Sequence, residues 1–72
     1  MEFILVLKIC SQLAMNCQPS LTYKEIYKTW KECEVKGLSE AQRIVMSSDE
    51  KWLNDYQILV QFACLPKQVT NS

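Results

Sequence analysis

The fold is decided by residues 22–48, which read TYKEIYKTWKECEVKGLSEAQRIVMSS. Apolar and small residues recur there at steps of three or four, which is the spacing of one helix face. Lysine, glutamate and arginine occupy the opposite face, so the stretch predicts a long amphipathic helix. The apolar stripe consists of Ile26, Trp30, Cys33, Gly37, Ala41, Ile44 and Ser48.

Two starts are open for this helix. Residues 22–25 have the pattern of a capping box, and residues 29–32 repeat it. The local signals favour the start at Thr22, whereas a start at Thr29 would release residues 22–28 as an additional strand. Gly37 can end the helix, with residues 39–42 capping a second one, or the helix can continue through it. We favour continuity, because Gly37 lies on the apolar stripe and would let the helix backbone lie close to a sheet at that point.

Two apolar stretches can pack against the stripe. Residues 3–10 and residues 56–64 both alternate in the manner of strands, and Pro66 ends the second one. We expect residues 11–20 to form a loop, residues 47–50 to begin a short helical turn, and residues 54–55 to form a turn. The side chains expected to face the helix are Phe3, Leu5, Leu7 and Ile9 on the first strand and Ile58, Val60, Phe62 and Cys64 on the second.

These elements predict an α+β fold, in which a small, mainly antiparallel sheet of two or three strands packs on one long helix. If residues 22–28 form a strand, the order is ββαβ and the two apolar strands can be antiparallel neighbours. If they belong to the helix, the order is βαβ and these strands can be parallel, joined by a right-handed crossover. We expect a single domain over residues 1–66 and a flexible tail over residues 67–72. A chain of 72 residues is near the lower limit for a self-sufficient core, so a covalent or metal staple is expected.

Four cysteines, at positions 10, 17, 33 and 64, can supply this staple. No Cys-x-x-Cys pair is present, so the usual zinc-ribbon and thioredoxin-like signatures are missing. We consider three interpretations of these cysteines. Two disulfides are preferred, followed by buried free thiols and then by a metal site. Cys64 faces the helix stripe that carries Cys33, whereas Cys10 lies on the outward face of its strand. We therefore predict the disulfides Cys33–Cys64 and Cys10–Cys17.

Charge and composition exclude several classes of function. Lysine plus arginine number eight, as do aspartate plus glutamate, and no basic run indicates a nucleic-acid or membrane partner. Histidine is absent, which removes the commonest general base and metal ligand. We expect no enzymatic activity and no cofactor. The first apolar stretch is short, follows Glu2 and contains Lys8, so it does not predict a signal peptide or a membrane span.

The aromatic residues Tyr23, Tyr27 and Trp52 are the candidates for contact with a protein partner, with lysines at the rim. The structural alternative is that they are half-buried side chains at the edge of a small core. A second candidate surface is the outward face of the sheet with Ile4, Val6 and Leu59, which would favour a homodimer.

Four motifs, Cys10, Cys17-Gln18-Pro19, Trp30-x-x-Cys33-x-x-x-Gly37 and Phe62-x-Cys64, resemble small cysteine-containing proteins of marine bacteriophages. The resemblance covers most of the chain, with a departure at residues 38–40. It implies a phage origin, the order strand, cysteine loop, helix and strand, and no catalytic residue.

The predicted function is a non-enzymatic protein-interaction module, phage-encoded and binding a host protein. The alternative is a disulfide-stabilised structural protein of the virion, and a metal or thiol-redox module comes third. The corresponding locations are the host cytoplasm or the virion.

Overall fold

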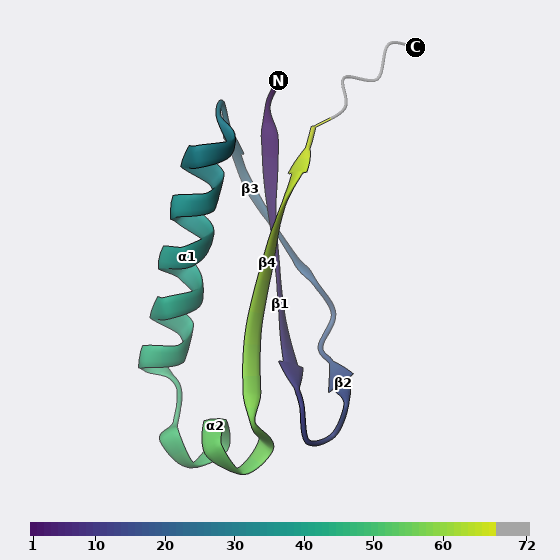
Figure 1. The fold of residues 1–72 in the computed structure, drawn as a ribbon, viewed down its shortest axis with the longest axis vertical. Coiled ribbons are helices and arrows are strands. Elements are labelled where there is room, and N and C mark those ends of the chain that lie inside the picture. Colours follow the sequence, from purple (N-terminus) through teal and green to yellow (C-terminus); the bar gives the residue numbers. More distant parts are fainter. Residues whose placement is uncertain (68–72) are drawn as a thin grey trace.

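The structure, a computed structural model, describes residues 1–67. In this part of the chain the elements are β1 (Phe3–Ser11), β2 (Asn16–Cys17), β3 (Leu21–Tyr27), α1 (Trp30–Ser47), α2 (Glu50–Tyr56) and β4 (Ile58–Pro66). The strands form one antiparallel sheet, and α1 runs along one face of it (Figure 1). The predicted α+β class is confirmed. The order ββαβ is extended by the two-residue β2, which lies in the segment expected to be a loop.

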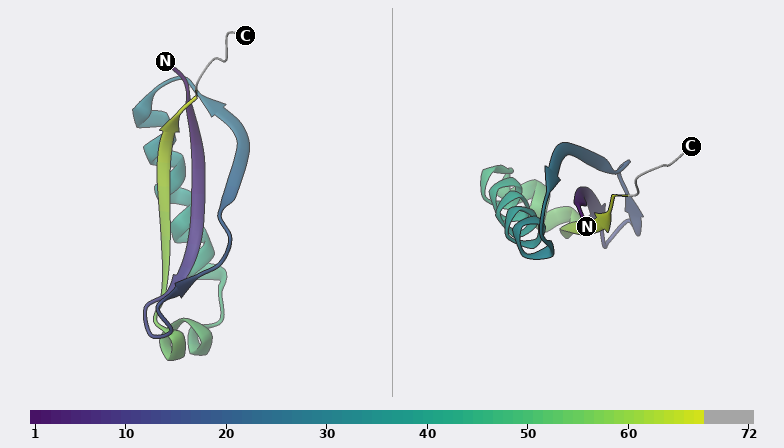
Figure 2. Two further views of the ribbon diagram at one scale, coloured as in Figure 1. Left: turned by 90° about the vertical axis from the view of Figure 1, so that its right-hand side faces the viewer. Right: turned by 90° about the horizontal axis from the view of Figure 1, so that it is seen from above.

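The central strand of the sheet is β1. On one side it pairs with β4 along its whole length, from Phe3 opposite Pro66 to Ser11 opposite Ile58. On the other side it pairs first with β3 and then, at its far end, with β2. Figure 2 (left) shows β4, β1 and β3 side by side with α1 behind them. The sheet therefore has a covered face toward α1 and an open face on the other side.

The core lies between α1 and the covered face. Leu5 and Leu7 of β1 and Cys33 of α1 are completely buried there. Phe62 of β4 packs directly on Gly37, where an added Cβ would lie within 2.8 Å of the Phe62 Cγ. The helix continues through Gly37, as predicted. Because glycine has no side chain, the helix backbone can approach the sheet closely at this point. The predicted inward faces of both long strands are also confirmed.

The favoured start of the helix at Thr22 is wrong, because α1 begins at Trp30. Thr29 is the N-cap, and its side-chain oxygen accepts a hydrogen bond from the Glu32 N–H at 3.1 Å. The preceding residues form β3, which is rich in the strand formers threonine, tyrosine and isoleucine. Pairing with the free edge of β1 gives their backbone groups partners, and this long-range gain overrides the local capping pattern. Ile26 consequently belongs to the sheet and not to the helix stripe.

The expectation that Trp30 belongs to the core is also wrong, since 54% of this residue is exposed. Its position at the first residue of α1 places it beyond the end of the core. One part of the ring is still covered, because the Phe3 and Trp30 rings meet edge to face with 5.7 Å between their centroids. Trp30 therefore covers one end of the core through its contact with Phe3.

The second long strand begins later than predicted. Residues 54–55, expected to form a turn, belong to α2, and the chain reverses at Gln57, whose φ is 51°. The strand is consequently Ile58–Pro66, displaced by two residues from the predicted range. Its end at the proline agrees with the prediction. Of the predicted flexible tail, residues 68–72 lie outside the described residues.

The structure contains the two predicted disulfides. Cys33–Cys64 joins α1 to β4 on the covered face, over a sequence separation of 31 residues. Cys10–Cys17 joins directly opposed residues of β1 and β2, with a separation of seven. All four cysteines are paired, so none of them offers a free thiolate to a metal or a redox partner in this structure.

Candidate protein-binding surface

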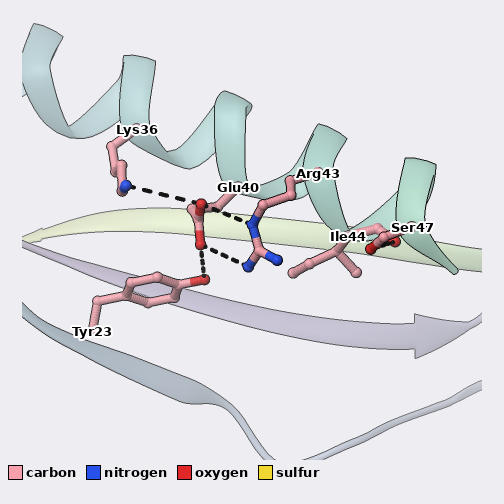
Figure 3. A network of polar contacts seen from close by, with 6 residues as sticks. All are labelled: Tyr23, Lys36, Glu40, Arg43, Ile44 and Ser47. Carbon is pink, nitrogen blue, oxygen red and sulfur yellow. Dashed lines mark hydrogen bonds and ion pairs between the residues drawn. The ribbon is translucent and has the colours of Figure 1, made fainter.

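Tyr23, a predicted partner contact, reaches across from β3 to α1. Its hydroxyl donates a hydrogen bond to Glu40 Oε1 at 2.9 Å (Figure 3). Arg43 donates to both oxygens of the same carboxylate, at 3.2 Å from Nε and at 3.0 Å from its terminal nitrogen, and Lys36 lies 3.9 Å from it. Tyr23 is half-buried in this contact, so its hydroxyl serves the packing of the helix on the sheet.

The charges around Glu40 keep this network in one protonation state. Hydrogen bonds from Arg43 and Tyr23 lower the pKa of Glu40 from 4.5 to about 2, against the opposing effect of its desolvation. Burial, followed by the hydrogen bond to Glu40, raises the pKa of Tyr23 above its ordinary value. Near neutral pH the carboxylate is therefore charged, and the tyrosine hydroxyl keeps the proton that it donates.

Tyr27 is buried, and its backbone pairs with that of Phe3 at one end of β1. Within residues 1–67 its hydroxyl has no hydrogen-bond partner. Burial raises the pKa of this group, with a further contribution from Glu25. The ring belongs to the core, together with Leu5 and Cys33.

Trp52, the third predicted contact residue, lies at the other end of β1. It is half-buried on α2, and with Tyr56 it lines a shallow hollow beside the Cys10–Cys17 disulfide. This hollow lies at the end of β1 that pairs with β2. Tyr27 lies at the opposite end, where it pairs with Phe3, the first residue of β1. The structure therefore does not bring the three aromatic residues into one patch.

Apolar side chains do gather on the open face of the sheet. Ile4 of β1 is flanked in register by Ile26 of β3 and Leu65 of β4, which are 44% and 48% exposed. The next row on this face places Val6 beside Ala63. Figure 2 (left) shows α1 on the opposite side of the sheet, and no helix of residues 1–67 lies across this open face. We call this surface the open-face patch, which consists of Ile4, Val6, Ile26, Ala63 and Leu65.

The chemistry of this surface is unusual for an outer face, which in an antiparallel sheet is ordinarily polar. Lys8 is the one charged residue of β1 and β4. It borders a hollow of about 550 Å³, which also has Val6, Ser20 and Ala63 in its lining. The surface can therefore bury apolar side chains of a partner, with Lys8 placed to meet an acidic group at the margin.

Part of this patch was predictable. The alternation of the first strand identified Ile4 and Val6 as outward residues, together with Leu59 on the last strand. Ile26 was missed because it was assigned to the helix. Ala63 shares the outward face of Leu59 in the same alternation, and Leu65 could have been found from a strand extended to Pro66.

Neither a metal site nor a membrane-spanning helix is found within residues 1–67. No group of three or more cysteine, aspartate or glutamate residues gathers there in a way that could hold a metal ion. Over the same range, no helix combines the length and the apolar character needed to cross a membrane. Comparison with protein-family models, with curated proteins and with solved structures finds no match to this chain. The resemblance to phage proteins stays a prediction.

Proposed function

We propose that the chain is a non-enzymatic protein-interaction module that binds its partner through the open-face patch. The observation that carries the proposal is the apolar row of Ile26, Ile4 and Leu65 across three strands. Exposed apolar surface of this kind is costly to leave in water, and such patches mark interaction sites. A partner that presents apolar side chains and an acidic group near Lys8 matches the surface.

The partner class follows from the resemblance to phage proteins, which makes a protein of the bacterial host the first candidate. Binding requires no catalytic group, in agreement with a sequence that contains no histidine. The two disulfides supply the rigidity that so small a domain needs in order to present a fixed surface.

The test begins with a photo-crosslinking amino acid in place of Ala63, an exposed residue of the patch on β4. The same group in place of Ser39, which is exposed on α1, serves as the matched control. Proteins that crosslink from position 63 and not from position 39, in cells that produce the chain, identify the partner. Equal recovery from both positions would contradict the proposal.

Binding is then measured with the purified partner. Val6→Lys and Ala63→Lys place a charge in the apolar contact, so we expect each to raise the Kd at least about tenfold. Ser39→Lys adds the same charge outside the patch and should leave the Kd unchanged. An unchanged Kd for both patch variants would rule out this surface as the binding site.

The disulfides favour one second candidate, a structural protein of the virion. Disulfide bonds persist in oxidising surroundings, such as those around a particle outside the cell. If this is the role, mass spectrometry of purified particles should detect the chain in a fixed copy number, with both bonds intact. Its absence from the particles would exclude this candidate and leave the host-binding module.

A further inference from the structure

The two edges of the sheet differ in their protection against pairing with another strand. The edge strand β3 carries Lys24 and Glu25, and its register with β1 is irregular between Ile4 and Val6. Charges and irregularities of this kind protect sheet edges. The other edge strand, β4, carries no charge over nine residues, and its one proline is the last of them. The β4 edge is therefore open to strand pairing.

The backbone groups of alternate residues of β4 point out of the sheet. Lys67 donates its N–H to the Glu2 carbonyl at 2.7 Å, and Gln57 accepts from the Gln12 N–H at 3.1 Å. These bonds show that odd-numbered residues along β4 direct their N–H and C=O groups toward β1, because in an antiparallel pair the direction alternates. The groups that face the free edge belong to Ile58, Val60, Phe62 and Cys64, without a pairing strand among residues 1–67.

The flank of α1 above this edge carries the exposed apolar residues Leu38 and Val45, with Lys31 and Glu34 toward the start of the helix. Gly37 faces the sheet, and Glu40 faces β3 through its hydrogen bond with Tyr23. Successive helical residues are rotated by about 100°. Leu38 and Val45 therefore lie on the flank opposite to Glu40, which is the flank toward the β4 edge. Both are exposed, Leu38 by 61%.

We propose that a second copy of this chain occupies the edge. The two β4 strands pair antiparallel about a twofold axis at Gln61, and the two α1 helices pack against each other on one face of the continuous sheet. This register pairs Val60 with Phe62 of the second copy and leaves Pro66, which has no N–H, outside the ladder. The inference goes beyond the proposed function, because it concerns the backbone edge of β4 and the flank of α1; of the open-face patch, only Ala63 borders this contact.

Self-pairing agrees with the chemistry of the strand. Since β4 is uncharged, pairing the strand with its own copy opposes no like charges within the sheet. Gln61 meets its own copy, so the two amides can hydrogen-bond, and Leu59 meets Ala63. A strand from another protein would satisfy the same backbone groups, but it would not bring a matching apolar helix flank to Leu38. A second copy does both, because Leu38 lies close to the axis and meets Leu38 of the other chain.

The first measurement is sedimentation equilibrium of the disulfide-intact chain over the micromolar range, which should show a monomer–dimer equilibrium. Leu38→Lys places two ammonium groups beside the axis, so we expect the dimer Kd to rise at least about tenfold. Met46→Lys is the matched control, because it adds the same charge on the same helix at a residue that is 77% exposed. Met46 lies away from the sheet, and this variant should dimerise like the wild type.

Amide hydrogen exchange then locates the interface. In the dimer the N–H groups of Val60 and Phe62 are bonded to the second β4, so they should exchange more slowly than in monomeric Leu38→Lys. A chain that stays monomeric up to about millimolar concentration would overturn the proposal. So would a dimer in which these two amides exchange as fast as in the variant. Val6→Lys should leave the dimer intact, and a dimer lost in this variant but kept in Leu38→Lys would place the contact on the open face instead.

Discussion

Neighbouring residues of β1 point to opposite faces of the sheet, and they differ in how deeply they are buried. Leu5 is completely buried under α1, whereas Val6, the next residue of β1, lies half-buried on the open face. Each face also has its own disulfide: Cys33–Cys64 fastens the helix to the covered face, and Cys10–Cys17 closes the β1–β2 hairpin from the open side. The difference shows that stability is concentrated on one face, which leaves apolar residues on the other free for contact.

The largest expected difference is between the two disulfides. Replacing Cys33 and Cys64 together by alanine should lower the free energy of unfolding by about 3–4 kcal/mol, because this bond closes the longer loop of the unfolded chain. Replacing Cys10 and Cys17 should cost about 2–3 kcal/mol. Urea unfolding without reductant measures both. Equal losses would contradict the dependence on loop length and would remove this difference between the two faces.

The next contrast is between adjacent residues of β1. Leu5→Ala removes side-chain atoms from a fully buried position and should cost about 3 kcal/mol of unfolding free energy. Val6→Ala, on the open face, should cost less than about 1 kcal/mol, since its side chain is already partly in water. Urea unfolding of the two variants gives the comparison. A loss at Val6 as large as that at Leu5 would show that the open face is also part of the core.

A smaller effect is expected where the helix touches the sheet. Gly37→Ala brings a Cβ against the Phe62 ring, and the overpacking should cost about 1–3 kcal/mol, reduced by up to about 1 kcal/mol because alanine favours the helix. In a Phe62→Ala background the obstacle is gone, so the same substitution should be neutral or stabilising. Thermal unfolding of the four proteins completes the cycle. The same cost in both backgrounds would mean that Phe62 does not set the approach of the helix.

The smallest contrast concerns the polar border of the covered face, where Glu40 meets Tyr23 and Arg43. The pKa of Glu40 is lowered to about 2 by these hydrogen bonds. The stability that they contribute is therefore present above about pH 4.5 and is lost as the pH falls toward 2. Glu40→Gln should flatten this part of the pH dependence of the urea midpoint, whereas Glu34→Gln should keep it. A wild-type pH profile in Glu40→Gln would exclude Glu40 as its source.

The candidate site was only partly accessible to sequence reasoning. Alternation identified Ile4 and Val6, because the faces of a strand follow directly from a period of two. Tyr23 and Tyr27 were predicted as partner contacts, yet one bonds to Glu40 and the other is buried. Aromatic residues are suited to cores and to interfaces alike, so their type does not tell which of the two they occupy.

The sequence by itself determined the two long strands, their inward faces, the helix that continues through Gly37, and the pairing of the cysteines. Each of these follows from local periodicity, which fixes the direction of a side chain once the element is known. Only the tertiary structure decided where the helix begins. Residues 22–25 and 29–32 both carry a capping pattern, and the local signals favour the first. The edge of β1 supplies hydrogen-bond partners to β3, and this pairing makes the helix begin after the second. Such a partner lies some twenty residues away in the chain, so no local signal at Thr22 could reveal it.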